Sequence, residues 1–155
     1  MGLFKVGVSM NPKSRNPLKS TPARRDSLIK ANLAAVAAHF QSESIRQIEK
    51  VSELYTDDIV WEAPARNLLF RGKKDVADNY RKMFASLTDL EIRNLECFAT
   101  ENRVFDDSIA RCKIIGPDFL PVPIGSQVEI RLVHIFELRE GKIAKETAFE
   151  MWKFV

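Results

Sequence analysis

Apolar residues recur at helical spacing in the first third of the chain. In residues 26–41 the apolar positions share one helical face: Ile29, Leu33, Val36, Ala37 and Phe40. A second helical pattern covers residues 43–58 and places Ile45, Ile48, Val51, Leu54 and Tyr55 together. Prolines are frequent before residue 23 and disfavour an earlier helix. We therefore predict two helices, the first starting at Asp26.

The middle of the chain changes pattern twice. The β-branched and aromatic segment IVWEAP, residues 59–64, predicts a short strand that ends at Pro64. Asp57 and Asp58, just before it, are interpreted as turn and capping acids. Residues 68–84 predict a brief extended piece, a turn and a third helix with these apolar positions: Val76, Tyr80, Met83 and Phe84.

Long strands follow from residue 90 onward, over residues 90–105, 108–116, 128–140 and 142–155. Helices first and long strands afterwards indicate an α+β fold, and four consecutive strands favour an antiparallel meander. The sequence REGK predicts a type I turn with Gly141 in a left-handed bulge position. If Leu138 and Lys142 are partners, His134 lies opposite Glu146.

The same register places Glu150 opposite Ile130 on one mostly apolar face. Two acids and a histidine on such a face are unfavourable unless they are paired or reach a wet cavity. His134, Glu146 and Glu150 are therefore the candidate catalytic residues. The opposite face carries further apolar positions, which predicts a homodimer through the outer side of the sheet: Val133, Ile135, Phe149 and Met151.

Composition adds limits on class and location. With 155 residues, of which 45% are hydrophobic, the chain is expected to form one domain with a real core. It has no apolar run long enough to span a bilayer, so we expect a soluble, cytoplasmic protein with no membrane partner. Cys97 and Cys112 lack zinc-ligand or disulfide spacing and are predicted to be buried free thiols.

Positive charge is concentrated at the start of the chain, where residues 1–30 hold seven Lys or Arg and one acid, Asp26. We interpret residues 1–25 as a basic, partly disordered tail and residues 26–155 as the domain. Contact with nucleic acid or anionic lipid and a transit-like leader are alternatives for the tail. The absence of interleaved aromatic residues favours a solvated terminus, so no nucleic-acid partner is predicted.

Three segments, LYTDDIVWEAP, FRGKKDVADNYRKMF and VPIGSQVEIRLVHIFELREGKI, resemble the nuclear transport factor 2-like superfamily. Within it they are similar to the SnoaL-like group, which includes polyketide cyclases and ketosteroid isomerases. The resemblance covers residues 26–155. It implies a cystatin-like cone, in which N-terminal helices pack on a curved, mainly antiparallel sheet that encloses a pocket.

The resemblance also assigns positions in the site. The proton-transferring aspartate of ketosteroid isomerases falls on Ala63, and their oxyanion-binding acid falls on His134, which argues against steroid isomerase chemistry. Cyclase-like members carry a late aspartate after a GKI sequence. Here GKI is residues 141–143, and Glu150 stands one residue before the position of that acid.

The pocket walls are predicted from these parities and from the resemblance: Trp61, Ala63, Tyr80, Phe84, Leu132, Phe136, Ala148 and Trp152. Such walls fit a small apolar or aromatic ligand. In this hypothesis His134 is the acid/base, Glu146 orients it and Glu150 is a second acid. No metal or other cofactor is required. The alternatives are that His134 is a satisfied core residue and that Glu150 meets solvent at the rim.

Two classes of function remain open at this point. One is a cofactor-independent enzyme of isomerase, cyclase, dehydratase or epoxide hydrolase type that acts on an apolar cyclic metabolite. The other is a non-catalytic ligand-binding or dimeric assembly module.

Overall fold

The computed structural model describes residues 20–44 and 47–155, so most of the predicted basic tail lies outside the described residues. The helices are α1 (Pro22–Ser44), α2 (Ile48–Glu53), the 3-10 helix η1 (Pro64–Arg66) and α3 (Lys73–Ala85). The strands are β1 (Tyr55–Ala63), β2 (Leu68–Arg71), β3 (Leu87–Ala99), β4 (Arg103–Ile114), β5 (Gln127–Arg139) and β6 (Lys142–Phe154).

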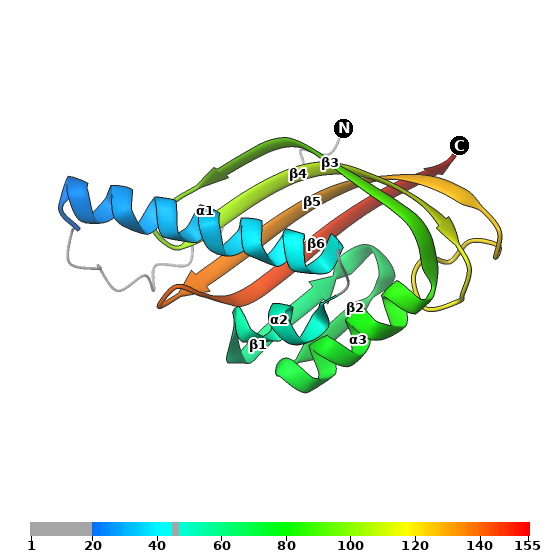
Figure 1. Ribbon diagram of the computed structural model, residues 1–155, viewed down its shortest axis with the longest axis horizontal. Coiled ribbons are helices and arrows are strands. Elements are labelled where there is room, and N and C mark those ends of the chain that lie inside the picture. Colours follow the sequence, from blue (N-terminus) through cyan, green and yellow to red (C-terminus); the bar gives the residue numbers. More distant parts are fainter. Residues whose placement is uncertain (1–19, 45–46) are drawn as a thin grey trace, which may run out of the picture.

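The strands form a single curved sheet in the order β2-β1-β6-β5-β4-β3 (Figure 1). β1 and β6 are parallel, and the other neighbouring strands are antiparallel. Helix α1 crosses one side of the long strands, and α2 and α3 lie beside the shorter strands β1 and β2 (Figure 1). This arrangement confirms the predicted α+β fold and the meander of four long strands.

Helix α1 begins at Pro22, earlier than the predicted start at Asp26. Proline has no N–H to donate, so the first position of a helix tolerates it, and Pro22 starts the helix instead of blocking it. The buried side of α1 contains polar residues: Asn32, His39 and Glu43 accompany Val36. Ala37, which was predicted to face inward, is exposed, so this prediction is wrong.

The second predicted helix is shorter than expected, because the chain enters β1 at Tyr55. Tyr55 is fully buried as the first residue of that strand. Asp57 and Asp58 are exposed strand residues whose carboxylates pair with Lys73 and Arg139, so their interpretation as turn and capping acids is wrong. The β-branched residues of this segment favour extended backbone and explain the earlier strand.

The turn between β5 and β6 has two residues instead of the predicted three. Arg139 pairs with Lys142, and Glu140 and Gly141 between them have φ angles of 52° and 76°. Two left-handed residues in a two-residue loop are typical of a type I′ turn, whose twist matches that of the paired strands. A register shift directly after Glu137 moves the strands further along each other.

The predicted pairing across this hairpin is therefore wrong. His134 lies opposite Ala148 instead of Glu146, and Glu150 lies opposite Leu132 instead of the predicted isoleucine. The displacement is by an even number of residues, and side chains alternate between faces with a period of two. As a result, the histidine and both acids still share the inner face of the sheet.

Two smaller expectations can be compared with the described residues. Cys112 is buried, but Cys97 is exposed on the edge strand β3, so the prediction of two buried thiols is wrong for Cys97. Among the described helices, none is long and apolar enough to cross a membrane. The cytoplasmic location stays a prediction.

Candidate active site

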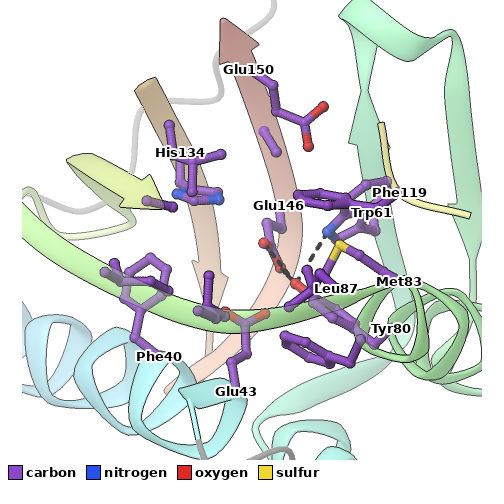
Figure 2. Close-up of a pocket in the computed structure, with 16 residues that line it drawn as sticks. Phe40, Glu43, Trp61, Tyr80, Met83, Leu87, Phe119, His134, Glu146 and Glu150 are labelled. Carbon is purple, nitrogen blue, oxygen red and sulfur yellow. Dashed lines mark hydrogen bonds between the residues drawn. The ribbon is translucent and has the colours of Figure 1, made fainter. Parts of the chain in front are cut away.

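A mostly apolar cavity lies between the helices and the inner face of the sheet (Figure 2). Its free volume is about 50 Å³, which is room for a few water molecules. Helices α1 and α3, strand β1 and the long strands β3 to β6 all contribute side chains to its walls. The polar side chains that reach it are Glu43, Tyr80, His134, Glu146 and Glu150.

Glu146 on β6 is the centre of a buried hydrogen-bond network. Its Oε2 accepts from the Tyr55 hydroxyl at 3.1 Å, and its Oε1 accepts from the Tyr80 hydroxyl at 2.9 Å. Trp61 Nε1 in turn donates to the Tyr80 hydroxyl at 3.2 Å, and Figure 2 shows this chain of contacts along one wall. The two phenols thus replace part of the hydration that the carboxylate loses on burial, and the indole holds one of these phenols in place.

His39 on α1 lies between this network and a second carboxylate. Its Nε2 is 3.3 Å from Glu43 Oε1 and 3.6 Å from Glu146 Oε2, although neither contact has hydrogen-bond geometry. Its Nδ1 is 3.4 Å from the Tyr55 hydroxyl. Since that hydroxyl donates to Glu146, its oxygen can accept from Nδ1–H, and Nε2 then faces two carboxylates. A proton on Nε2 avoids repulsion between the lone pair of this nitrogen and the two carboxylates.

The pKa directions in this cluster agree with that inference. Burial lowers the pKa of His39, but the charges of Glu43 and Glu146 outweigh burial and raise the pKa to about 9. Burial raises the pKa of Glu43, and the opposite charge of His39 offsets only part of this rise. For Glu146, burial also acts upward, but His39 and the Tyr80 hydrogen bond outweigh it and lower the pKa. Glu146 is therefore the ionised carboxylate, and Glu43 is the one that holds a proton more readily.

The same three side chains could hold a metal ion, because one ligand atom from each of His39, Glu43 and Glu146 lies within 4.8 Å of the others. An imidazole nitrogen and two carboxylate oxygens suit ions such as Zn²⁺. In the protonation state described above, however, Nε2 of His39 already carries a proton between the two carboxylates. A proton and a cation would compete for this position.

His134 on β5 contacts Asp106, not the predicted partner Glu146. The two residues are opposite each other on β5 and β4, and His134 Nδ1 is 3.6 Å from Asp106 Oδ2. Asp106 also accepts from Asn94 Nδ2 at 2.5 Å and from Ser108 Oγ at 2.8 Å. Burial lowers the pKa of His134, but the Asp106 carboxylate and the more distant acids outweigh burial and raise it.

Glu150 does not meet solvent at a rim but forms a buried ion pair with Arg66. Its carboxylate accepts from Arg66 Nε at 2.6 Å and from Nη2 at 2.8 Å, and both side chains are almost completely buried. Arg66 Nη1 donates to the Phe119 carbonyl oxygen at 2.9 Å, and the guanidinium lies near the rings of Trp61 and Phe119. This bidentate pair fixes the end of β6 against η1.

The predicted pocket walls are mostly in place. The cavity is lined, as predicted, by Trp61, Tyr80, Phe84, Leu132 and Ala148. Three other predicted residues are not among its lining: Ala63 and Phe136 are buried in the core, and Trp152 lies further along β6 beside a surface depression. Catalytic roles for His134, Glu146 and Glu150 stay predictions.

Sequence reasoning missed four functional candidates: His39, Glu43, Arg66 and Asp106. His39 and Glu43 stand four residues apart, which is the spacing of side chains that meet on one helix face. The two residues fell in separate predicted helices, residues 26–41 and 43–58, whereas α1 contains both, so the spacing was hidden by the predicted boundary. Arg66 and Asp106 gave no comparable local signal, because their partners are distant in sequence.

Comparison with known proteins identifies the fold and the family of the chain. The chain shares its fold with an LEH-like epoxide hydrolase from M. tuberculosis, at 20% identity and a TM-score of 0.64, over 79% of this chain and 84% of that chain. It is also similar to the epoxide hydrolase/cyclase-like enzyme SalBIII of salinomycin pyran ring formation, at 18% identity and a TM-score of 0.68, over 81% and 97% of the two chains.

A predicted SnoaL-like polyketide cyclase from Jannaschia sp. CCS1 is similar at 18% identity and a TM-score of 0.72, over 86% of this chain and 91% of that chain. At these identities the likeness establishes the fold alone. No curated protein sequence is significantly similar to the chain. A family model for the SnoaL-like domain matches residues 33–146, which is most of the chain. The chain therefore belongs to the SnoaL-like domain family.

Proposed function

We propose that the protein is a small enzyme that catalyses proton transfer on an apolar, ring-containing metabolite held in the cavity, without a metal or an organic cofactor. The reaction class is isomerisation, cyclisation, dehydration or epoxide opening. One observation carries the proposal. Glu43 and Glu146 line the same apolar cavity, and their surroundings shift their pKa values in opposite directions. Two carboxyl groups whose pKa values are shifted apart are suited to act as acid and base.

The roles follow from the protonation states. Glu43, the carboxyl that keeps its proton more readily, donates it to a ligand oxygen. Glu146, the ionised carboxylate, accepts a proton or stabilises developing positive charge. His39 contacts both carboxyl groups and can pass a proton between them, which would restore the starting state after a turnover.

His134 supplies a second titrating group on the neighbouring wall of the cavity. Asp106 faces Nδ1, so Nε2 is the nitrogen available to the cavity. The raised pKa of His134 favours imidazolium, which would bind and protonate an oxygen of the ligand. Asp106 acts here as a positioning residue, because it contacts His134 but does not itself line the cavity.

A non-catalytic binding module is the second candidate, and the size of the cavity supports it. A free volume of about 50 Å³ is less than a ring-containing ligand occupies. Ligand entry would therefore need movement of partly buried walls such as Met83 and Leu90. If these walls do not move, the buried polar network has a structural role only.

The decisive experiment combines a ligand screen with one substitution. Thermal-shift screening against cyclic ketones, epoxides, terpenoids and aromatic polyketides would find ligands, and mass spectrometry would then detect turnover. We expect Glu43→Gln to lower kcat by on the order of 100-fold or more while ligand binding is kept. Glu49→Gln, an exposed glutamate on α2, is the matched control and should leave kcat unchanged.

Full turnover by Glu43→Gln would remove Glu43 from the mechanism. Ligands that bind but are never converted, by wild type or by either variant, would favour the binding module.

A further inference from the structure

We propose that a groove next to the cavity is a second subsite, which binds the hydrogen-bond-accepting part of the ligand whose apolar part occupies the cavity. This inference extends the proposed function, because it defines the substrate class of the same site. The groove lies between η1, β2, α3 and the loop before β5, and its free volume is about 590 Å³. It is therefore much larger than the cavity itself.

Asn79 is the first observation that points to a ligand in this groove. Its side chain lines the groove, the residue is only 7% exposed, and its Nδ2 has no hydrogen-bond partner. A buried amide donor without a partner destabilises the folded state. Nδ2 itself has almost no exposed surface, so a ligand oxygen would satisfy it after the amide turns toward the groove. Asn79 directly precedes Tyr80, so the same turn of α3 serves the groove and the Glu146 network.

Arg66 is the second observation. A guanidinium has five N–H donors, and the contacts with Glu150 and the Phe119 carbonyl use three of them. Two donors therefore remain on a side chain that is already held in place and that lines the groove. Lys82 adds a cation on the same helix as Asn79 and three residues further along, which is on the same side.

The groove and the cavity are separated by one shared wall, so a single ligand can occupy both once a side chain of that wall moves. Phe119 lines both spaces, and Glu150 of the cavity is bonded to Arg66 of the groove. Figure 2 shows Phe119 and Glu150 on the same side of the cavity, next to Trp61. A ligand that displaces the Phe119 ring would place its apolar ring near Glu146 and its polar end beside Asn79.

The donors define the chemical class of that polar end. Asn79, Arg66 and Lys82 all donate, so the group is a carboxylate, a carbonyl or a phosphate oxygen. Asp118 on the groove wall opposes the charge of Lys82, and Glu150 opposes that of Arg66. The groove is therefore rich in donors without a large net charge. It should accept a neutral carbonyl or an anion and reject an ammonium group.

The test uses three probes with one apolar body: 4-phenylbutanoate, 4-phenylbutan-1-ol and 4-phenylbutylamine, each titrated calorimetrically into the full chain. We expect the carboxylate to bind most tightly and the amine most weakly. Asn79→Leu keeps the side-chain size but removes the donor, so it should weaken carboxylate binding about three- to ten-fold. The same variant should melt at the wild-type temperature or above, because it removes an unsatisfied buried group.

Lys74→Gln, on the same helix but outside the groove lining, is the matched control and should bind all probes as wild type does. Equal affinity for the three probes, unchanged carboxylate binding in Asn79→Leu, or no carboxylate binding at millimolar concentration would each overturn the subsite. Glu43→Gln separates the two proposals, since it should keep the carboxylate affinity whatever its effect on turnover.

Discussion

Glu146 and Glu150 stand four residues apart on β6, point to the same inner face and are both buried, yet their surroundings differ completely. Glu150 is neutralised by a bidentate guanidinium, which stays charged at every accessible pH. Glu146 is surrounded by two phenols, whose pKa values burial raises further, and by the imidazole of His39, which can gain or lose a proton.

In the proposed function, this difference distinguishes Glu150, which holds two elements together, from Glu146, which takes part in proton transfer. A permanent partner holds Glu150 in a single ionisation state and joins β6 to η1. The imidazole partner of Glu146 can change its protonation, and the neighbouring Glu43 has its pKa shifted the opposite way. Burial alone therefore does not mark a functional acid. The proposed function distinguishes the two acids by the nature of their partners.

The largest predicted effect comes from breaking the structural pair. Arg66→Met leaves the Glu150 carboxylate buried and unpaired, so the free energy of unfolding should fall by about 3–5 kcal/mol. Urea denaturation followed by circular dichroism measures it. The double variant Arg66→Met with Glu150→Met should recover most of the loss, because no charge then remains buried. An exposed ion pair contributes about 1 kcal/mol or less. A loss in this range for the single variant would show that Glu150 does not depend on Arg66 as a buried partner.

The pH dependence of stability tests the titrating partner of Glu146. The pKa of His39 is raised from 6.5 to about 9 in the folded protein. Its contribution to stability is therefore complete below pH 6.5 and is lost as the pH rises through about 9. The size of this loss is on the order of 3 kcal/mol.

Urea unfolding across this range should show the decline in wild type and a flatter profile in His39→Gln. His134→Gln should keep the decline near pH 9, because His39 causes it, and should lose only the contribution of the raised pKa of His134 itself. NMR titration of the His39 ring gives the pKa directly. A value near 6.5 would mean that Glu43 and Glu146 do not act on His39 as the geometry indicates.

Sequence reasoning reached the fold and the inner face, but not the partners. The alternation along β5 and β6 placed His134, Glu146 and Glu150 on one face, and the even register error left this correct. Alternation depends only on local spacing, which the sequence contains. The hairpin register depends on Glu140 and Gly141 both adopting positive φ, and glutamate seldom does so.

The site partners could not be predicted for a different reason. His39 and Glu43 come from α1, Arg66 from η1 and Asp106 from β4, so they meet Glu146, Glu150 and His134 only through the tertiary fold. The helical pattern was assigned from its apolar positions, and polar residues on the buried side of α1 were left out. A search for His and Glu at a spacing of four would have found the first pair.

At His134 we expect a moderate effect, and the test is whether the substitution changes turnover or stability. His134→Gln keeps the size and part of the hydrogen bonding, so stability should change by about 1 kcal/mol or less. Turnover of an identified substrate should fall on the order of 100-fold if the imidazole transfers a proton. Asp106→Asn should lower the pKa of His134. The pH profile of kcat should then move to lower pH, with little change in KM. Full activity in His134→Gln would leave the cluster around Glu146 as the sole acid/base centre.

The smallest effect on the fold is expected on the opposite face of the same strand. Met151 lies between the buried side chains of β6 and is 61% exposed, and Phe149 beside it is 41% exposed. We propose that this outer face forms a homodimer, since it would otherwise leave apolar side chains in water. Met151→Lys should then give a monomer in sedimentation at micromolar concentration, while wild type sediments as a dimer. The monomer should keep its secondary structure, because a lysine on an exposed position costs about 0.5 kcal/mol or less. A wild-type protein that sediments as a monomer at this concentration would contradict the proposed dimer.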